Sequence, residues 1–312
     1  MIIARSLGEV SPNPRSFVTV GTFDGVHLGH ARIIKELTTR AASRCGRSVL
    51  ITFEPHPRDV VGRGKVKWLT SLDERLSVIG DLGIDVVLVI EFTYDFSRLS
   101  SREFYEKYVV RGIEVSEVIL GFDHMFGRDR EAGIKEVREL GQEFGFKVDV
   151  VDPVSIRGEV VSSTIIRELI HHGNIERAGE YLGRPFSIEG TVVKGDQRGR
   201  DLGFPTINVD LRFASQIIPA DGVYAATVEL AGKRFYGMSY IGVRPTFYTD
   251  QNRVIEVNMF DYEGDDYGSK VRVYFHKRIR HDKTFSSKDD LIAQLHIDRS
   301  ECMKFIASIK QS

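Results

Sequence analysis

Cysteine is scarce in this chain of 312 residues, which contains only Cys45 and Cys302. The two residues lie far apart, and no Cys-x-x-Cys pair occurs. This scarcity argues against a disulfide framework and against a cysteine-based zinc site. Few cysteines are also typical of a reducing compartment, so we expect a cytoplasmic protein.

Long hydrophobic runs are also missing. The longest continuous apolar run is Val86–Ile90, whereas a membrane-spanning helix needs about 20 apolar residues. The first ten residues, MIIARSLGEV, reach charge and glycine too early for the apolar region of a signal peptide. We therefore expect no membrane partner.

An excess of charge of one sign is absent as well. The chain has 43 Lys and Arg against 44 Asp and Glu, a net charge of −1. This balance lacks the basic footprint of a nucleic-acid-binding protein, so we expect no nucleic-acid partner. The length and the 42% hydrophobic content are enough for two domains, since most domains have about 100 to 150 residues.

The first half of the chain alternates strand and helix patterns. Helical patterns cover Leu28–Ser43 and Glu131–Phe144. Short apolar strands are predicted at Phe17–Val20, Val49–Phe53, Val86–Ile90, Val118–Leu120 and Val148–Val151. This alternation predicts an α/β domain with a parallel sheet and right-handed crossovers.

The pattern changes after Leu182, and Gly183–Phe186 forms a plausible junction. Short strands separated by turn residues follow, and Ala231–Gly232 is expected to turn a hairpin. The predicted strands are Ile188–Val193, Tyr224–Leu230, Arg234–Tyr240, Val254–Met259 and Val271–Phe275. Such spacing favours a sandwich or a barrel, and a helix from about Lys288 to Ile309 closes the chain.

The strongest local signal is VTVGTFDGVHLGH at Val18–His30. A strand enters a glycine-containing loop, and the loop enters a helix, so free backbone N–H groups and the positive helix end point at one place. His27 and His30 lie on one face at the helix start and can donate to a phosphate. Gly29 between them would let a nucleotide approach the backbone closely. The alternative is a pair of capping histidines with no chemistry.

Polar segments at other element ends could complete this site. VSSTIIR at Val161–Arg167 places hydroxyls before a helical turn and an arginine inside it, which suits phosphate, although a plain capped helix fits as well. TFEPHPR at Thr52–Arg58 and GFDHMFG at Gly121–Gly127 follow strands, where open α/β sheets bind ligands. We expect His56 and His124 to be structural or rim residues and not metal ligands.

A second glycine-rich segment, KGDQRGRDLGFPTIN, covers Lys194–Asn208. Its glycines can wrap phosphate, but it lacks the GK[ST] of a Walker loop. Thr206 and Asn208 project to one side of a strand, and their oxygens suit Mg²⁺ shared with ATP phosphates. Taken by itself, this segment could be an ordinary hairpin.

The first half of the chain resembles known enzymes at several of these motifs. HLGH resembles the HxGH signature of the nucleotidylyltransferases, and VSSTIIR resembles their ISSTxIR motif. TFEPHP and GFDHMFG resemble segments of the bacterial FAD synthetases, although His124 stands where that family often has Phe. The resemblance implies a Rossmann-like domain over 1–183 in which His27, His30 and Arg167 are catalytic. The residues expected to bind the nucleotide are Gly21, Phe23, Asp24, Gly25, Gly29, Asp123, Ser162, Ser163 and Thr164.

The second half resembles the riboflavin kinases. GRDLGFPTIN is similar to their GRxLGFPTxN signature, and GVYAA, IGVRPTF, EVNMFDY and YG follow in the same order. The resemblance implies a six-stranded β-barrel with a terminal helix over 184–312. Nucleotide binding is expected at Gly195, Arg200, Gly203 and Pro205, and Mg²⁺ binding at Thr206 and Asn208.

Glu256 is the expected base for proton transfer. Ile255, Val257 and Met259 alternate with it on one strand, so Glu256 and Asn258 face away from that apolar side. In the riboflavin kinases the matching Glu is the proposed base for the ribityl 5′-hydroxyl, and the family usually has His where this chain has Asn258. A solvent-facing strand glutamate is the alternative.

Together the two halves resemble the prokaryotic bifunctional riboflavin kinase/FMN adenylyltransferases. The resemblance implies that riboflavin, FMN and ATP are substrates, that Mg²⁺ is required, and that FMN and FAD are products. Two alternatives stay open at this point. One is a nucleotidylyltransferase of another substrate class with an unrelated barrel, and the other is a flavin or nucleotide sensor with one active site.

Overall fold

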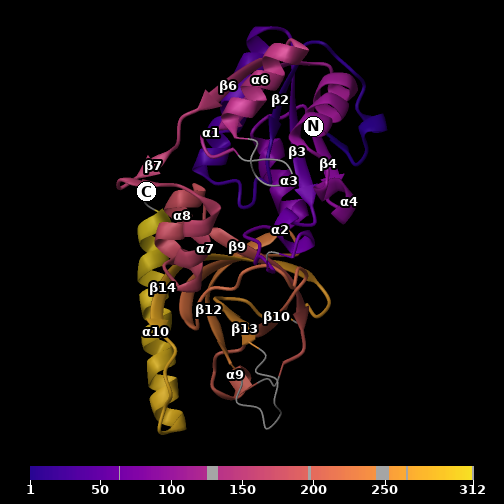
Figure 1. Cartoon of the computed structure of the whole chain (residues 1–312). Coiled ribbons are helices and arrows are strands. Elements are labelled where there is room, and N and C mark those ends of the chain that lie inside the picture. The colour runs from indigo at the N-terminus through magenta and orange to yellow at the C-terminus, as the bar shows by residue number, and fades with distance from the viewer. Residues whose placement is uncertain (63, 125–132, 196–197, 244–252, 265, 311–312) are drawn as a thin grey trace. The chain divides into compact units, whose positions relative to one another are not determined.

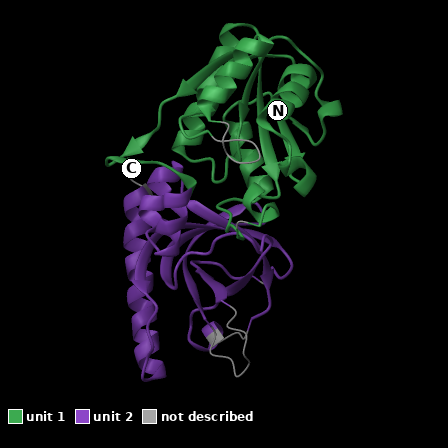
Figure 2. Ribbon diagram, viewed as in Figure 1, with its two compact units in different colours: residues 1–163 green, residues 164–312 purple. Residues whose placement is uncertain are grey.

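The computed structural model describes residues 1–62, 64–124, 133–195, 198–243, 253–264 and 266–310 (Figure 1). The chain forms two compact units, Met1–Ser163 and Thr164–Ser312 (Figure 2). The first is α/β and the second is built around a β-barrel, so the predicted fold class is confirmed.

A parallel six-stranded sheet forms the centre of the first unit, with the order β1-β4-β3-β2-β5-β6 (Figure 1). Its strands are β1 (Ile2–Ala4), β2 (Ser16–Val20), β3 (Arg47–Glu54), β4 (Val86–Glu91), β5 (Val115–Gly121) and β6 (Lys147–Val151). Five of them match predicted strands. β1 was not predicted, because three residues are too few to show a period.

Both faces of this sheet are buried, as parallel sheets require. Val18 and Ile51 contribute to the apolar core on one face. Phe17 and Leu50, the neighbours of those residues in the chain, contribute to the core on the other face. The continuous apolar strands of the sequence therefore bury alternate residues in two different cores.

Helices connect the strands of this sheet. They are α1 (Leu28–Ser43), α2 (Pro57–Val60), α3 (Leu72–Asp81), α4 (Tyr94–Ser97), α5 (Ser101–Phe104), the π-helix η2 (Tyr105–Ile113) and α6 (Ile134–Phe144), with a 3₁₀ turn η1 (Leu7–Glu9) and a hairpin of β7 (Ser155–Ile156) and β8 (Glu159–Val160). α1 has the bounds that its apolar stripe predicts. The sheet order places β2 between β3 and β5, so the carboxyl ends of β2 and β5 meet at the topological switch point, where such sheets bind ligands.

The second unit contains a closed antiparallel barrel with the order β10-β13-β12-β11-β14-β9. Its strands are β9 (Phe186–Val193), β10 (Ile207–Leu211), β11 (Gly222–Leu230), β12 (Lys233–Val243), β13 (Arg253–Met259) and β14 (Lys270–His281), with a short helix α9 (Arg198–Asp201) before β10. The predicted hairpin turn is confirmed, since Ala231 and Gly232 have φ of 49° and 75°, as a two-residue turn needs.

The closing helix, α10 (Lys288–Lys310), packs against β11, β12 and β14. Cys302 and Ile306 join Val223 and Met238 in a buried cluster. The Arg280 guanidinium also binds the buried Asp298 carboxylate, with Nε 2.9 Å from Oδ2. α10 is therefore fixed to the outside of the barrel.

Two further helices, α7 (Ser163–His171) and α8 (Ile175–Leu182), lie mainly in the second unit. α8 packs against β14 and β9, and Lys277 on β14 lies 3.8 Å from the Glu176 carboxylate. The compact units consequently divide after Ser163, earlier than the boundary between 183 and 184 that the sequence predicts for the domains.

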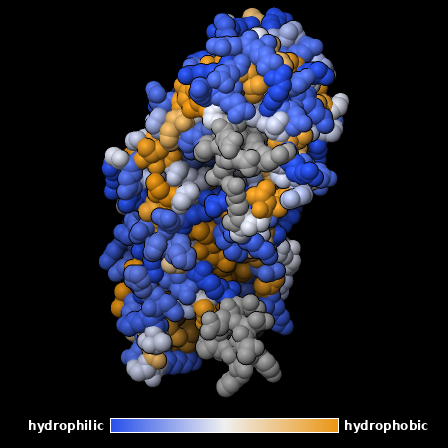
Figure 3. Space-filling view, in the orientation of Figure 1, coloured by the Kyte–Doolittle hydropathy of each residue, from blue (hydrophilic) through white to orange (hydrophobic). Residues whose placement is uncertain are grey.

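Most of the surface in Figure 3 is hydrophilic, with small hydrophobic patches between the charged side chains. Within the described residues, every helix is either too short or too polar to cross a membrane.

Candidate active sites

The first candidate site lies where β2 ends and α1 begins. Between them the backbone turns through positive φ at Phe23 (50°), Gly25 (80°) and Val26 (38°). This conformation is unusual for a β-branched residue such as Val26 and costs conformational energy. Buried hydrogen bonds from distant parts of the chain offset that cost.

The His27 and His30 rings stack on each other, with centroids 3.7 Å apart and planes inclined by 17°. His27 is the N-cap of α1, and its Nδ1 accepts a hydrogen bond from the His30 backbone N–H at 3.3 Å. Because Nδ1 is an acceptor, a neutral His27 carries its proton on Nε2. The predicted pair is therefore brought together, with one imidazole fixed as an Nε2–H donor at a helix N-terminus.

Gly29 and Gly21 leave space for the neighbouring rings of His27 and Phe23 in this loop. A Cβ on Gly29 would lie 3.1 Å from the His27 ring, and one on Gly21 would lie 3.1 Å from the Phe23 ring. The sequence assigns Gly29 to close approach of a nucleotide. In the structure, its missing side chain lets the His27 ring fold back over the helix start.

Asp24 anchors the loop from inside. Its carboxylate is 1% exposed and accepts from the backbone N–H groups of Leu69, at 3.0 Å, and Thr70, at 3.2 Å. The Thr70 hydroxyl accepts from the Gly25 N–H at 3.1 Å. The Asp24 side chain therefore faces the interior and shapes the loop, and nucleotide binding at this residue stays a prediction.

A buried arginine, which no sequence motif indicated, holds the strand end of the same loop. Arg75 Nη1 donates to the Thr22 carbonyl at 2.8 Å and Nη2 donates to Glu54 Oε2 at 2.7 Å. Its guanidinium lies 4.6 Å from the Trp68 ring centroid. Burial raises the pKa of Glu54, and the Arg75 charge opposes that rise.

The other predicted residues of this site lie on other segments of the chain. The Ser163 hydroxyl donates to the Asp24 carbonyl at 3.0 Å, which joins the VSSTIIR segment to the loop. Ser162 directly precedes α7, and Thr164 and Arg167 lie on α7 in the second unit. Asp123 is exposed just beyond the end of β5, the neighbour of β2.

His56 and His124 both make structural contacts. His56 Nδ1 caps α2 by accepting from the Arg58 N–H at 3.0 Å, and its ring packs on Trp68. His124 Nε2 lies 3.3 Å from the hydroxyl of the fully buried Tyr105. The remainder of GFDHMFG, and residues 244–247 of IGVRPTF, lie outside the described residues.

His124 should make the stability of the first unit depend on pH. Burial lowers the pKa of His124 to about 4, whereas an unfolded chain protonates histidine below about pH 6.5. Acid therefore favours the unfolded state, and stability should fall from pH 6.5 toward pH 4 by about 1 kcal/mol per pH unit. Urea unfolding at pH 7 and pH 5.5 should show a smaller loss in His124→Phe than in the parent. Equal losses would contradict this assignment.

The second candidate site lies on the barrel. On neighbouring strands, Asn208 of β10 is directly opposite Glu256 of β13, and Glu256 is directly opposite Tyr240 of β12. Side chains at such positions share one face of the sheet, with Cβ atoms about 5 Å apart. Burial raises the pKa of Tyr240 to about 12, aided by the charge of Asp282, by a hydrogen bond to Asp282, and by the charges of Asp221 and Glu256, so its hydroxyl stays protonated.

The glycine-rich segment lies against the two predicted Mg²⁺ ligands, Thr206 just before β10 and Asn208 on it. A Cβ on Gly195 would overlap the Asn208 side-chain amide, and one on Gly199 would lie 3.2 Å from Thr206 Oγ1. The sequence assigns Gly195 to wrapping of phosphate. In the structure it provides the surface on which the Asn208 amide rests.

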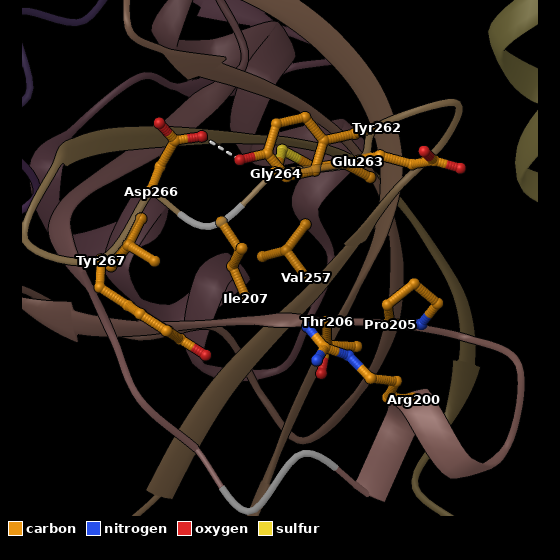
Figure 4. Close-up of a pocket in the computed structure, with 12 residues that line it drawn as sticks. Arg200, Pro205, Thr206, Ile207, Val257, Tyr262, Glu263, Gly264, Asp266 and Tyr267 are labelled. Atoms are coloured by element: carbon orange, nitrogen blue, oxygen red, sulfur yellow. Dashed lines mark hydrogen bonds between the residues drawn. The ribbon is translucent and has the colours of Figure 1, made fainter.

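A cavity of about 270 Å³ opens beside Thr206. Arg200, Pro205 and Thr206 lie on one side of it, and Tyr262 and Asp266 lie on another (Figure 4). The Tyr262 hydroxyl donates to the Asp266 carboxylate. The other lining residues are Val192, Ile207, Val257, Met259, Glu263, Gly264 and Tyr267.

Ile207 and Val257, which line the cavity, are the chain neighbours of Asn208 and Glu256, so the cavity and the row lie on opposite faces of the β10–β13 pair. Neither Asn208 nor Glu256 lines the cavity. Of the other predicted residues, Arg200 and Pro205 line it, whereas Gly203 has φ of 77° with open space around its Cα. The sequence did not indicate the cavity, because its walls come from strands and loops that are distant in the chain.

Gly195→Ala tests the support of Asn208. The added methyl group would displace the Asn208 amide, and loss of support behind a metal ligand typically costs 10- to 100-fold. We expect ATP-dependent chemistry at the barrel to slow by about that factor, with a higher Mg²⁺ requirement. Activity at the first site in the same preparation is the control. An unchanged Mg²⁺ requirement would contradict this role.

Comparisons with known proteins show the family of each half of the chain. The family model for FAD synthetase matches residues 10–165, and the one for riboflavin kinase matches residues 182–306. The bifunctional riboflavin kinase/FMN adenylyltransferase of Listeria monocytogenes is 35% identical over 94% of this chain and 93% of its own length. This chain belongs to that bifunctional family. Its first unit carries the FAD synthetase domain, and its second carries the riboflavin kinase domain.

Other members of the family match over nearly the whole chain. The enzyme of the same name from Bacillus subtilis is 34% identical, over 95% of this chain and 94% of the relative. That from Escherichia coli is 34% identical over 99% of both chains. A crystal structure from Streptococcus pneumoniae, named a macrolide-efflux protein, has a TM-score of 0.87 and 31% identity, covering 95% of this chain and 96% of that one.

Proposed function

We propose that the barrel phosphorylates riboflavin with ATP to give FMN and ADP, and that the α/β unit converts FMN and a second ATP to FAD and pyrophosphate. One observation carries the first half of this proposal. The expected base, Glu256, and the expected metal ligand, Asn208, are register partners on adjacent strands. The stacked His27 and His30 rings at the start of α1 support the second half.

In the kinase step, the half-buried Glu256 carboxylate accepts the proton of the riboflavin 5′-hydroxyl. The hydroxyl oxygen bonds to the γ-phosphorus of ATP while the bond from that phosphorus to the bridging oxygen breaks, and ADP leaves. Positioning and charge neutralisation supply most of the acceleration in such transfers. Tyr240 lies opposite Glu256, and its protonated hydroxyl donates to the Asp282 carboxylate.

The residues around Thr206 fit a magnesium ion bound to ATP. The Thr206 hydroxyl and the Asn208 amide oxygen are hard donors, and ATP phosphates and water complete such a shell. No cluster of three acidic, histidine or cysteine ligands occurs in the described part of the chain, which suits an ion held mainly by substrate. When bound, Mg²⁺ neutralises the charge on the phosphates of ATP.

The cavity beside Thr206 is suited to the base and sugar of ATP. Val192, Ile207, Val257 and Met259 give it an apolar wall, and Tyr262 and Tyr267 lie in its lining. Such rings can stack on a purine. A base in the cavity would place its phosphates near Arg200 and Thr206, at the end of the strand pair that carries Asn208 and Glu256.

In the adenylyl transfer, an FMN phosphate oxygen attacks the α-phosphorus of ATP and pyrophosphate leaves. Nε2–H of His27 and the His30 ring donate hydrogen bonds to the phosphate oxygens as their charge grows, and the VSSTIIR motif predicts the same role for Arg167. The N-terminus of α1 adds its positive end. No side-chain base is needed, since the FMN phosphate is already an anion at neutral pH.

One incubation tests the proposal. The purified chain with riboflavin, ATP and Mg²⁺ should give FMN first and then FAD, separated by chromatography, and removal of Mg²⁺ with EDTA should stop both steps. FMN without FAD would indicate the sensor alternative, with one active site. No flavin product would refute the assignment. The cytoplasmic location stays a prediction.

A further inference from the structure

Asn258 lies two residues after Glu256 on β13, and its side chain is 4% exposed. It shares the sheet face of Glu256 and is the register partner of Met238 on β12. Its Nδ2 donates to the Pro205 carbonyl at 2.6 Å. Because a carbonyl only accepts, the atom that contacts it must be the amide nitrogen.

This hydrogen bond extends the pairing of two strands by one residue. The ladder of β10 and β13 runs from Asn208↔Glu256 to Ile207↔Val257, and the next position would place Thr206 opposite Asn258. There the Asn258 side chain binds the carbonyl of the peptide that links Pro205 to Thr206. That peptide is planar, so fixing its oxygen also fixes the Thr206 nitrogen.

We propose that Asn258 is a positioning residue for the magnesium–nucleotide complex, because it ties Thr206 to the strand that carries Glu256. This inference rests on the proposed kinase function. The hydrogen bond from Asn258 to the Pro205 carbonyl therefore holds Thr206, the expected hydroxyl ligand, at a fixed position relative to Glu256, the expected base. An amide does not titrate, so this hydrogen bond holds at every working pH.

A second feature of Asn258 points to a bound ligand. Its Oδ1 is buried and accepts no hydrogen bond from any described residue. A buried acceptor without a donor is unfavourable, and a ligand hydroxyl or a metal-bound water would satisfy it. Replacement of Asn258 should therefore weaken binding of the metal complex in addition to loosening Thr206.

The test compares Asn258→Leu and Asn258→Ala with Thr227→Val. Thr227 is a matched control, because its buried hydroxyl bonds His276 Nε2 at 2.7 Å on the same barrel, away from the site. We expect both Asn258 variants to need 10- to 100-fold more Mg²⁺ for half-maximal FMN formation, with kcat largely restored at high Mg²⁺. Thr227→Val should need the same Mg²⁺ as the parent.

Calorimetry gives a readout that is independent of turnover. ADP is titrated into each full-length variant with and without Mg²⁺, and the site in the first unit serves as internal reference. Mg²⁺ should increase the ADP affinity of both sites in the parent. In the Asn258 variants we expect this increase to be at least tenfold smaller at the barrel site and unchanged at the site in the first unit. An unaltered gain, or a lower kcat with an unaltered Mg²⁺ requirement, would overturn the role of Asn258. Parent protein that makes no FMN would instead refute the kinase assignment.

Discussion

Replacing Glu256 with glutamine or alanine is expected to reduce FMN formation by about 10²- to 10⁴-fold, the usual contribution of a positioned general base. Glutamine keeps the size of the side chain and its place opposite Asn208, but it cannot accept the proton of the riboflavin hydroxyl. Conversion of supplied FMN to FAD should proceed at the parent rate. Both rates are measured by chromatography of the flavins.

Asp210→Asn is the matched control for Glu256. Asp210 is an exposed carboxylate on β10, two residues after Asn208, and its loss should leave both reactions unchanged. If Glu256→Gln formed FMN at the parent rate, Glu256 would not be the base. If a folded Glu256 variant lost both reactions, the two steps would not belong to separate sites.

The opposite defect is expected from His30→Ala. Removing one donor that stabilises developing charge typically costs about 10²- to 10³-fold, so FAD formation from FMN and ATP should fall by that factor. Phosphorylation of riboflavin should continue. The backbone N–H of residue 30, which binds His27 Nδ1, remains in the alanine variant, and this preserves the cap of α1.

His171→Ala provides the comparison for His30. His171 is exposed at the end of α7, and its removal should leave FAD formation close to the parent rate. Thermal denaturation of each variant checks that the fold survives. If His30→Ala made FAD at the parent rate, the stacked histidines would have no catalytic role and would serve only to cap α1.

Much of the fold could be predicted from local patterns. α1 has its predicted bounds, because an apolar stripe and a capping residue define a 16-residue helix. The Ala231–Gly232 turn was predictable from residue type. The division after Ser163 was not, because it depends on α8 packing against strands of the barrel, which no local pattern encodes.

In the candidate sites too, short motifs predict local residues but not contacts between distant parts of the chain. The motifs predict His27, His30, Asn208 and Glu256 as site residues, since their chemistry and spacing lie within short segments. They could not reveal Arg75, which binds the Thr22 carbonyl from 53 residues away.

Long-range contacts also give two residues packing roles that the sequence does not reveal. The Asp24 carboxylate binds backbone N–H groups inside the protein, and Gly195 lies against the Asn208 amide. Both roles depend on partners that only the folded chain brings close.

A crystal structure of the full chain with Mg²⁺ and a non-hydrolysable ATP analogue would show whether the chain has two nucleotide sites. We expect two nucleotides per chain, one with phosphates against His27 and His30 and one with phosphates beside Thr206 and Asn208. A nucleotide bound at only one of these places, with packed side chains filling the other, would contradict this expectation.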